Sequence, residues 1–269
     1  MAVTRRGYIF GAFLSSVLCV LLVIVAIASD SWVVSLARAQ TQSQDSRVRY
    51  GLFRGELILN NLNTPSVNQL YLTCVSDKNA CAATCKTTTE AREAEVRALA
   101  NGYTMNLNCD SVTQISTDNP RSEPPVLKFT LYVFTTLLLF VMLACAALSA
   151  ALAIVNAATN PTEPVFGLPG CLWSNVVTAF IGLVVMIMFG AYWASSGLKD
   201  HLAFSYTSVG PFNPVNPALG YSYWLIFPAI VCAILNIILI KLRAYLLEKD
   251  PPAPVIKVDN HSDGTIFLY

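Results

Sequence analysis

Four long stretches without a single charged residue constrain this chain more than any other feature of its sequence. They cover residues 7–29, 129–158, 165–198 and 221–240. Each reaches the roughly 20 apolar residues that a helix needs to cross a hydrocarbon core of about 30 Å. Because lipid offers backbone polar groups no partners, each stretch is predicted to be a helix. The chain is therefore predicted to be a membrane protein, and a composition of 55% hydrophobic and 12% charged residues agrees with that class.

Basic residues beside these stretches predict the orientation of the chain. Arg5 and Arg6 precede the first stretch, and Lys241 and Arg243 follow the fourth, whereas the short connection between the third and fourth contains only Lys199. The positive-inside rule then predicts that both termini lie in the cytosol of a multi-pass plasma-membrane protein. An arginine pair before an apolar run also resembles a cleavable signal peptide. This run is longer than usual for one, so we expect it to stay as an anchor.

These boundaries divide a single domain into consecutive segments. In chain order they are transmembrane helix 7–29, extracellular loop 30–128, transmembrane helix 129–158, cytosolic loop 159–168, transmembrane helix 169–196, extracellular loop 197–220, transmembrane helix 221–244 and cytosolic tail 245–269. The tryptophans fit this frame, because amphipathic rings collect at the headgroup level. Trp32, Trp193 and Trp224 are predicted to lie at the outer interface, and Trp173 at the inner one.

The larger extracellular loop contains four cysteines, Cys74, Cys81, Cys85 and Cys109. An even set in a loop that faces an oxidising compartment predicts two disulfide bonds and leaves three pairings open. A zinc site is the alternative interpretation. The spacings do not match a paired CxxC site and the loop contains no histidine, so we expect disulfides, with no metal or cofactor.

Alternating apolar positions predict strands within this loop. They fall at residues 31–37, 52–59, 69–75 and 103–109. The sequence "TTTEAREAEVRALA" at 87–100 predicts a short helix with a Thr87 cap and with its charges on the solvent side. The fold class predicted from these patterns is a four-transmembrane-helix bundle with a small extracellular antiparallel β-sheet and one short helix.

The composition of the helices excludes several classes of function. None of the four stretches contains Asp, Glu, Lys, Arg or His. Charges inside a membrane are costly and are kept for function, so we expect neither an enzyme nor a pump nor an ion pore in the bundle. A net charge of +1 likewise gives no footprint for nucleic acid.

Small residues at a spacing of four predict close packing between the helices. They recur from Gly7 to Cys19 and from Cys145 to Ala157. Such residues let backbones approach in lipid, and we expect packing within the bundle ahead of a homo-oligomer face. Three asparagines in or near the helices are predicted to form interhelical hydrogen bonds: Asn156, Asn175 and Asn236.

A family resemblance is carried by "YGLFRGE" at residues 50–56. A tryptophan after the first helix, a Gly-Leu-aromatic motif and loop cysteines resemble the claudin-like four-transmembrane superfamily. The motif resembles the YGLFHGE of clarins more closely, and "SYWLIFPAIVCAILNIILIKL" at 222–242 is similar to the fourth clarin helix. The chain therefore resembles a divergent clarin with a longer first extracellular loop. The motif residues are Trp32, Tyr50, Gly51, Leu52 and Phe53.

The resemblance implies a non-catalytic membrane organiser or scaffold. Clarins are associated with sensory-cell membranes and with actin-based protrusions, so similar membrane specialisations are implied here. For the motif itself, a period of two predicts a strand, with Tyr50 and Leu52 on one face and Gly51, Phe53 and Gly55 on the other. We expect Phe53 to anchor the sheet onto the helices.

Two features of the cytosolic side suggest contacts there. The chain ends in Phe267, Leu268 and Tyr269, whose alternate hydrophobic side chains and free carboxylate fit a ligand of a PDZ-type adaptor. An unremarkable tail is the alternative. Cys171, at the cytosolic end of the third helix, is a candidate for palmitoylation, and the alternative is a plain buried cysteine.

Three functions remain open at the level of the sequence. The first is a scaffold that contacts the lipid bilayer, membrane or cell-surface proteins and a cytosolic adaptor. The second is a claudin-type barrier or pore between cells, in which charged residues of the first loop line the pathway. The third is an auxiliary subunit of an ion channel.

Overall fold

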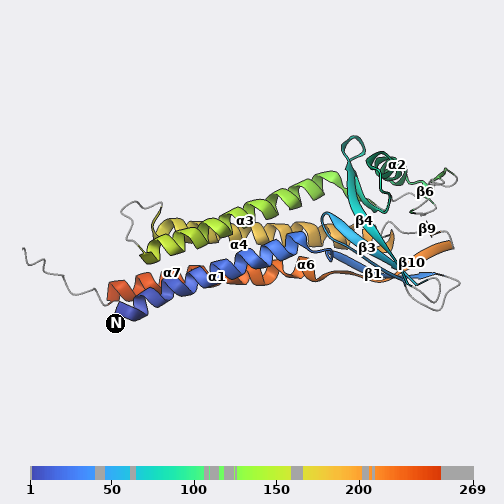
Figure 1. The fold of residues 1–269 in the computed structure, drawn as a ribbon. Helices are drawn as coiled ribbons and strands as arrows, with labels where there is room; N and C mark the ends of the chain where they lie inside the picture. Colours follow the sequence, from blue (N-terminus) through green and yellow to red (C-terminus); the bar gives the residue numbers. More distant parts are fainter. Residues whose placement is uncertain are drawn as a thin grey trace, which may run out of the picture.

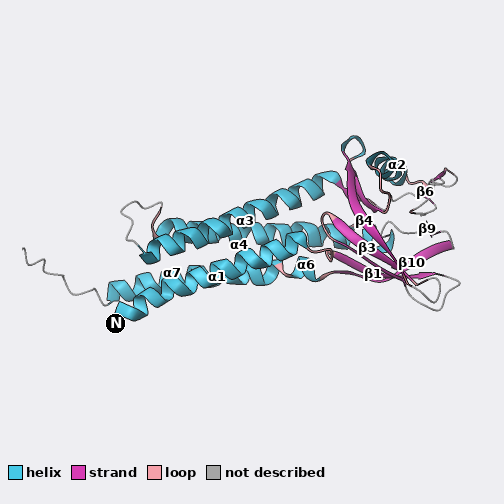
Figure 2. Cartoon of the chain, viewed as in Figure 1, coloured by secondary structure: helices cyan, strands magenta, loops and turns pink. Residues whose placement is uncertain are grey.

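The computed structural model describes residues 2–39, 46–60, 65–105, 109, 115–117, 124, 126–158, 166–201, 206–207 and 210–249. Long helices form a bundle at one end of the molecule, and a β-sheet with one short helix forms the other end (Figure 1). Figure 2 shows the same separation of helix and strand along the long axis. The predicted bundle with an antiparallel sheet is therefore present, with more strands than the sequence indicated.

The bundle is built from helices that are long and apolar enough to cross a membrane. They are α1 (Ala2–Ala28), α3 (Phe129–Ala158), α4 (Leu168–Ser195) and the pair α6 (Tyr221–Trp224) and α7 (Ile226–Lys249). Helix α1 packs against α3 and α7, and α4 packs against the same two helices. The four spanning helices therefore form a closed bundle, in agreement with the four-helix bundle predicted from the apolar stretches.

A buried polar network joins one residue from each span. Asn236 Nδ2 of α7 donates to Ser16 Oγ of α1 at 2.9 Å and to Asn175 Oδ1 of α4 at 3.1 Å. Asn175 Nδ2 donates to Ser149 Oγ of α3 at 2.6 Å, and the Ser16 and Ser149 hydroxyls lie 3.1 Å apart. The prediction of interhelical bonds is confirmed for Asn175 and Asn236. Asn156 Nδ2 donates instead to the carbonyl of Phe166, which follows the connection between α3 and α4.

Replacing Asn236 with leucine should destabilise the bundle. The Asn236 side chain is fully buried, and its loss leaves the Asn175 carbonyl oxygen without its donor in an apolar interior. Interhelical hydrogen bonds in membranes contribute about 1–2 kcal/mol, so we expect a loss of that size in detergent-based thermal unfolding. Ile234→Leu, at a side chain 43% exposed on the same helix, is the control. Equal stability of the two variants would contradict the structural role of the network.

The sheet contains strands from both predicted outer loops. Its antiparallel order is β8-β5-β4-β3-β2-β1-β10-β9, and a separate pair is β6-β7. The bounds are β1 (Val33–Ala39), β2 (Ser46–Tyr50), β3 (Arg54–Leu59), β4 (Ser66–Val75), β5 (Ala80–Thr84), β6 (Thr104–Met105), β7 (Ile115–Ser116), β8 (Leu127–Lys128), β9 (Tyr206–Thr207) and β10 (Gly210–Leu219). Two short helices complete the set: η1 (Ser76–Lys78) and α5 (Leu198–His201).

Six of the strands were not predicted from the sequence: β2, β5, β7, β8, β9 and β10. Two of these, β10 and β5, form against the local sequence preference. β10 carries Pro211, Pro214 and Pro217, which the sequence rules treat as strand breakers, and it pairs with β1 next to a register shift between Val34 and Leu36. β5 is "ACAAT", a segment of small residues with weak strand preference. In both cases pairing with a neighbouring strand outweighs local preference. The strand predicted at 103–109 is reduced to β6, and residues 106–108 lie outside the described part.

Helix α2 (Thr89–Ala100) differs from its prediction in two respects. Its N-cap is Thr88, and the Thr88 side chain makes no capping hydrogen bond. Its charges do not all face solvent, because Glu95 is only 2% exposed. The apolar Val96 and Leu99 are buried with it against β4 and β5, which explains why the helix turns this acidic residue inward.

Candidate functional site

The motif "YGLFRGE" is a hairpin and not one strand. Tyr50 ends β2, residues 51–53 turn, and Arg54 begins β3; the Gly51 N–H donates to the Arg54 carbonyl at 2.7 Å. Tyr50 and Gly55 are paired across the hairpin and are both buried. The predicted alternation of faces is therefore wrong. Phe53 is 41% exposed, which also contradicts its expected role as the anchor onto the helices.

The turn is fixed by close contact with the end of α1. A Cβ atom at Gly51 would overlap the carbonyl oxygen of Ser29, so only glycine fits at this point. Leu52 beside it is 3% exposed. The Trp32 N–H donates to the Tyr50 carbonyl at 3.0 Å, and the Gly220 N–H donates to the Trp32 carbonyl at 2.8 Å. The junction between the bundle and the sheet therefore contains Trp32, Tyr50, Gly51 and Leu52.

Trp32 is the centre of this junction. Its indole N–H donates to the Ala26 carbonyl at 2.7 Å, and its ring lies edge-on to Phe189 of α4 and Tyr223 of α6. Trp32 is 1% exposed, so its predicted place in an interfacial belt is wrong. Trp173 and Trp224 are 66% and 56% exposed, as interfacial rings would be. Aromatic contacts from α4 and α6, together with the hydrogen bond to α1, hold the start of β1 in a fixed direction.

The two faces of the sheet have different surroundings. One face carries Val48, Tyr50, Leu57 and Leu70, which belong to one buried cluster with Trp32 and the apolar residues of the bundle. A buried phenol is hard to ionise, and burial raises the pKa of Tyr50. The sheet and the bundle therefore share a continuous core, so the sheet is not free to move as a separate unit.

The opposite face of β2, β3 and β4 is the candidate site, and we call it the arginine face. Strand register places Arg47 beside Ile58, Arg49 beside Glu56, and Arg54 beside Tyr71. Arg47 and Arg54 are exposed, and Val67 is 61% exposed. The Arg49 and Glu56 side chains form an ion pair at 2.7 Å. Since this pair is partly exposed, it orients the two side chains more than it stabilises the fold.

Helix α2 covers the neighbouring part of the same face. Val96 and Leu99 of α2 are buried against Val75, Ala80 and Ala82 of β4 and β5. At the boundary, the Arg92 guanidinium lies 4.9 Å from the centre of the Tyr71 ring, and Tyr71 Oη donates to Gln69 Oε1 at 3.1 Å. Helix α2 does not extend beyond Tyr71, so Arg47 and Arg54 on the arginine face are exposed.

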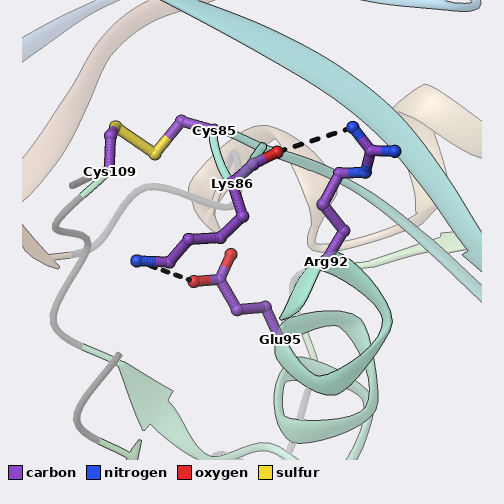
Figure 3. The surroundings of a disulfide bond; sticks show 5 residues. All are labelled: Cys85, Lys86, Arg92, Glu95 and Cys109. Carbon is purple, nitrogen blue, oxygen red and sulfur yellow. Dashed lines mark hydrogen bonds and ion pairs between the residues drawn. A yellow bond between two sulfur atoms is a disulfide. The ribbon is translucent and has the colours of Figure 1, made fainter. Parts of the chain in front are cut away.

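Two disulfides lie in this region, and the one that flanks α2 is drawn in Figure 3. Cys74 pairs with Cys81 across β4 and β5, and Cys85 pairs with Cys109. Two disulfides were predicted and are present; the pairing was open and is now assigned. Directly after Cys85, Lys86 Nζ lies 3.9 Å from Glu95 Oε1, with both side chains buried (Figure 3). Arg92 Nη1 donates to the Lys86 carbonyl at 3.5 Å, so the start of α2 is tied to the disulfide from two sides.

The chain matches no model of a known protein family, and no curated protein matches it.

The remaining predicted site residues lie elsewhere. Cys171 is 1% exposed and its thiol contacts Ser149 inside the bundle, which agrees with the alternative of a plain buried cysteine. Phe267, Leu268 and Tyr269 lie outside the described residues, so the PDZ-type ligand stays a prediction. Within the described residues, no three His, Cys, Asp or Glu side chains gather in a way that fits a metal ion.

The residues of the arginine face that precede the motif were not singled out from the sequence. The signal for them is the alternation in "SRVRY" at residues 46–50, where Arg47 and Arg49 stand between buried positions. Such alternation is typical of a strand with one buried and one open face.

Proposed function

We propose that this chain is a non-catalytic membrane scaffold of the clarin-like type, whose arginine face binds a partner protein at the membrane surface. The observation that supports this most is the exposure of Arg47 and Arg54 on a sheet whose other face is part of the bundle core. A surface in fixed relation to the membrane presents the same side chains at every encounter, which lowers the cost of ordering them on binding.

The chemistry of the arginine face favours an acidic partner. Three arginines and one glutamate leave it with an excess of positive charge, and arginine forms bidentate bonds to carboxylates. Exposed Val67 and the edge of Tyr71 add apolar area of the kind found at protein interfaces. The resemblance of "YGLFRGE" to the clarin motif supports the same class of function. The proposed orientation, with cytosolic termini at the plasma membrane, places this face outside the cell.

Charge reversal on this face should remove partner binding. We expect Arg47→Glu and Arg54→Glu each to lower the recovery of a co-purifying protein about tenfold in mild-detergent affinity purification, since truncated or reversed arginines at interface centres typically cost at least that much. Lys78→Glu in η1 is the matched control, because Lys78 is exposed on the same domain but off the face. Full recovery with every variant would reject the arginine face as the binding site.

Two different measurements separate the other two functions. A claudin-type barrier or pore protein should alter transepithelial resistance when expressed in epithelial cells and should form intercellular strands in non-adherent cells. A channel auxiliary subunit should be recovered with a channel in fixed stoichiometry. Either result would replace the scaffold proposal with that function, whichever residues of the arginine face are involved.

A further inference from the structure

The bundle-facing side of α7 ends in an arginine. Residues at spacings of three and four face the interior along this helix, and each of them is buried: Ile226, Ala229, Ala233, Asn236 and Ile240. Arg243 is the next residue of this series. A guanidinium therefore stands where the helical pattern calls for an apolar side chain.

Arg243 has no protein partner among the described residues. Its side chain is half-buried, and its Nε atom is fully buried without a hydrogen-bond acceptor. A buried donor without an acceptor is costly. An anion bound to the guanidinium would supply the missing acceptor and a charge of opposite sign.

Beside Arg243 the helices leave a narrow groove, which we call the Arg243 groove. Its walls are apolar and come from all four spans, including Ile9 of α1, Ala153 of α3, Leu168 of α4 and Leu239 of α7. Tyr8 of α1, Cys171 of α4 and Arg243 of α7 are also among its lining residues. The groove is therefore apolar, and Tyr8 and Arg243 are the residues beside it whose side chains can donate a hydrogen bond to a phosphate.

The groove lies at membrane-surface level, at the end of the bundle away from the sheet. The start of α1 and the end of α7 meet at this end (Figure 1). From Trp224 to Arg243 the helical rise of about 1.5 Å per residue gives roughly 28 Å, close to the thickness of a hydrocarbon core of about 30 Å. With Trp224 at one headgroup level, Arg243 is at the other. Lys241 and Lys249 are exposed nearby on α7 and make this end basic.

We propose that the Arg243 groove binds an anionic phospholipid, with its phosphate on the Arg243 guanidinium and the Tyr8 hydroxyl, and with an acyl chain along the apolar walls. The positive charge of Arg243 and the position of the groove at the membrane surface favour this ligand. A free phosphate ion would leave the apolar walls empty, and a zwitterionic lipid would bring its own cation toward the basic end. An arginine also matches the phosphate oxygens in a bidentate fashion. The inference does not depend on the function proposed for the arginine face.

Lipid binding can be measured on the purified, full-length chain after delipidation in detergent. Phosphatidylglycerol or phosphatidylcholine is added, and bound lipid is counted by native mass spectrometry while the melting temperature is recorded. We expect phosphatidylglycerol to be retained and to raise the melting temperature, since a ligand that binds only the folded state stabilises it. Arg243→Gln should weaken retention about tenfold or more, as expected for the loss of a charged hydrogen-bond donor. Lys241→Gln removes the same charge from the exposed side of α7 and should retain the lipid.

Several results would overturn the proposal. Equal retention of the two lipids by the unmodified chain would do so, as would equal retention by Arg243→Gln and Lys241→Gln. An equal rise in melting temperature with inorganic phosphate alone would assign the site to a free ion. If Asp250→Asn, Asp259→Asn and Asp263→Asn together abolish the effect of Arg243→Gln, the anion is the tail of this chain. Should Arg243→Gln fail to fold, Tyr8→Phe must weaken phosphatidylglycerol retention for the proposal to stand.

Discussion

Trp32→Ala should unfold the junction between the bundle and the sheet, with a loss of about 3–5 kcal/mol in the free energy of unfolding, the range found for buried aromatic truncations. The ring is 1% exposed and contacts Phe189 at a centroid distance of 5.1 Å and Tyr223 at 6.1 Å. The substitution removes these contacts and the indole donor to the Ala26 carbonyl. Denaturant-induced unfolding in detergent, followed by intrinsic fluorescence, measures the change.

Trp224→Ala provides the matched control for that substitution. Trp224 is 56% exposed on α6, close to Tyr223, and its loss should cost far less. Limited proteolysis gives a second readout, because a loosened junction should make the sheet cleavable while the bundle remains intact. Similar losses for the two tryptophan variants would show that Trp32 does not hold the junction.

Gly51→Ala is also expected to be strongly destabilising, although it adds a single methyl group. The added Cβ would overlap the Ser29 carbonyl oxygen and would lie 3.0 Å from the Asp30 Cα atom. Both are backbone atoms, so no side chain can rotate to relieve the contact. We expect a loss of about 3 kcal/mol, at the upper end of typical overpacking costs, in the same unfolding assay.

Gly7→Ala tests whether the effect comes from the position or from the residue type. A Cβ at Gly7 in α1 meets nothing within 4 Å. Alanine favours helices over glycine by up to about 1 kcal/mol, so Gly7→Ala should be neutral or slightly stabilising. A tolerated Gly51→Ala would mean that the hairpin does not sit against α1 as described.

The helices and the outer domain differ in how far their sequences determine them. In lipid, a long apolar stretch has no alternative to a helix, so the spans follow from composition and length alone. The strands are less determined, because their preference depends on neighbours that the sequence does not place. The proline-containing β10 and the alanine-rich β5 are strands through pairing with β1 and β4. The disulfide pairing depends on that same register, since Cys74 and Cys81 are opposite each other.

The candidate site shows a similar limit. The sequence identified "YGLFRGE" as a marker but not its shape, because the turn at residues 51–53 contains none of the usual Asn-Gly or Asp-Gly signals. Contact with Ser29, some twenty residues earlier in the chain, fixes it. The arginine face had a local signal in the alternation around Arg47 and Arg49. Which part of the sheet stays exposed depends on where α2 packs, and the local sequence does not determine that packing.

The polar network of the bundle has a consequence for biosynthesis. Ser16, Ser149 and Asn175 belong to the first three spans, while Asn236 comes from the last. The Ser16 and Ser149 hydroxyls and the Asn175 Nδ2 group have partners within the first three spans, but the Asn175 side-chain oxygen accepts its hydrogen bond from Asn236, 61 residues later in the chain. A chain that stops before α7 would leave that oxygen without this donor. The network is therefore complete only when the last span has packed against the first three.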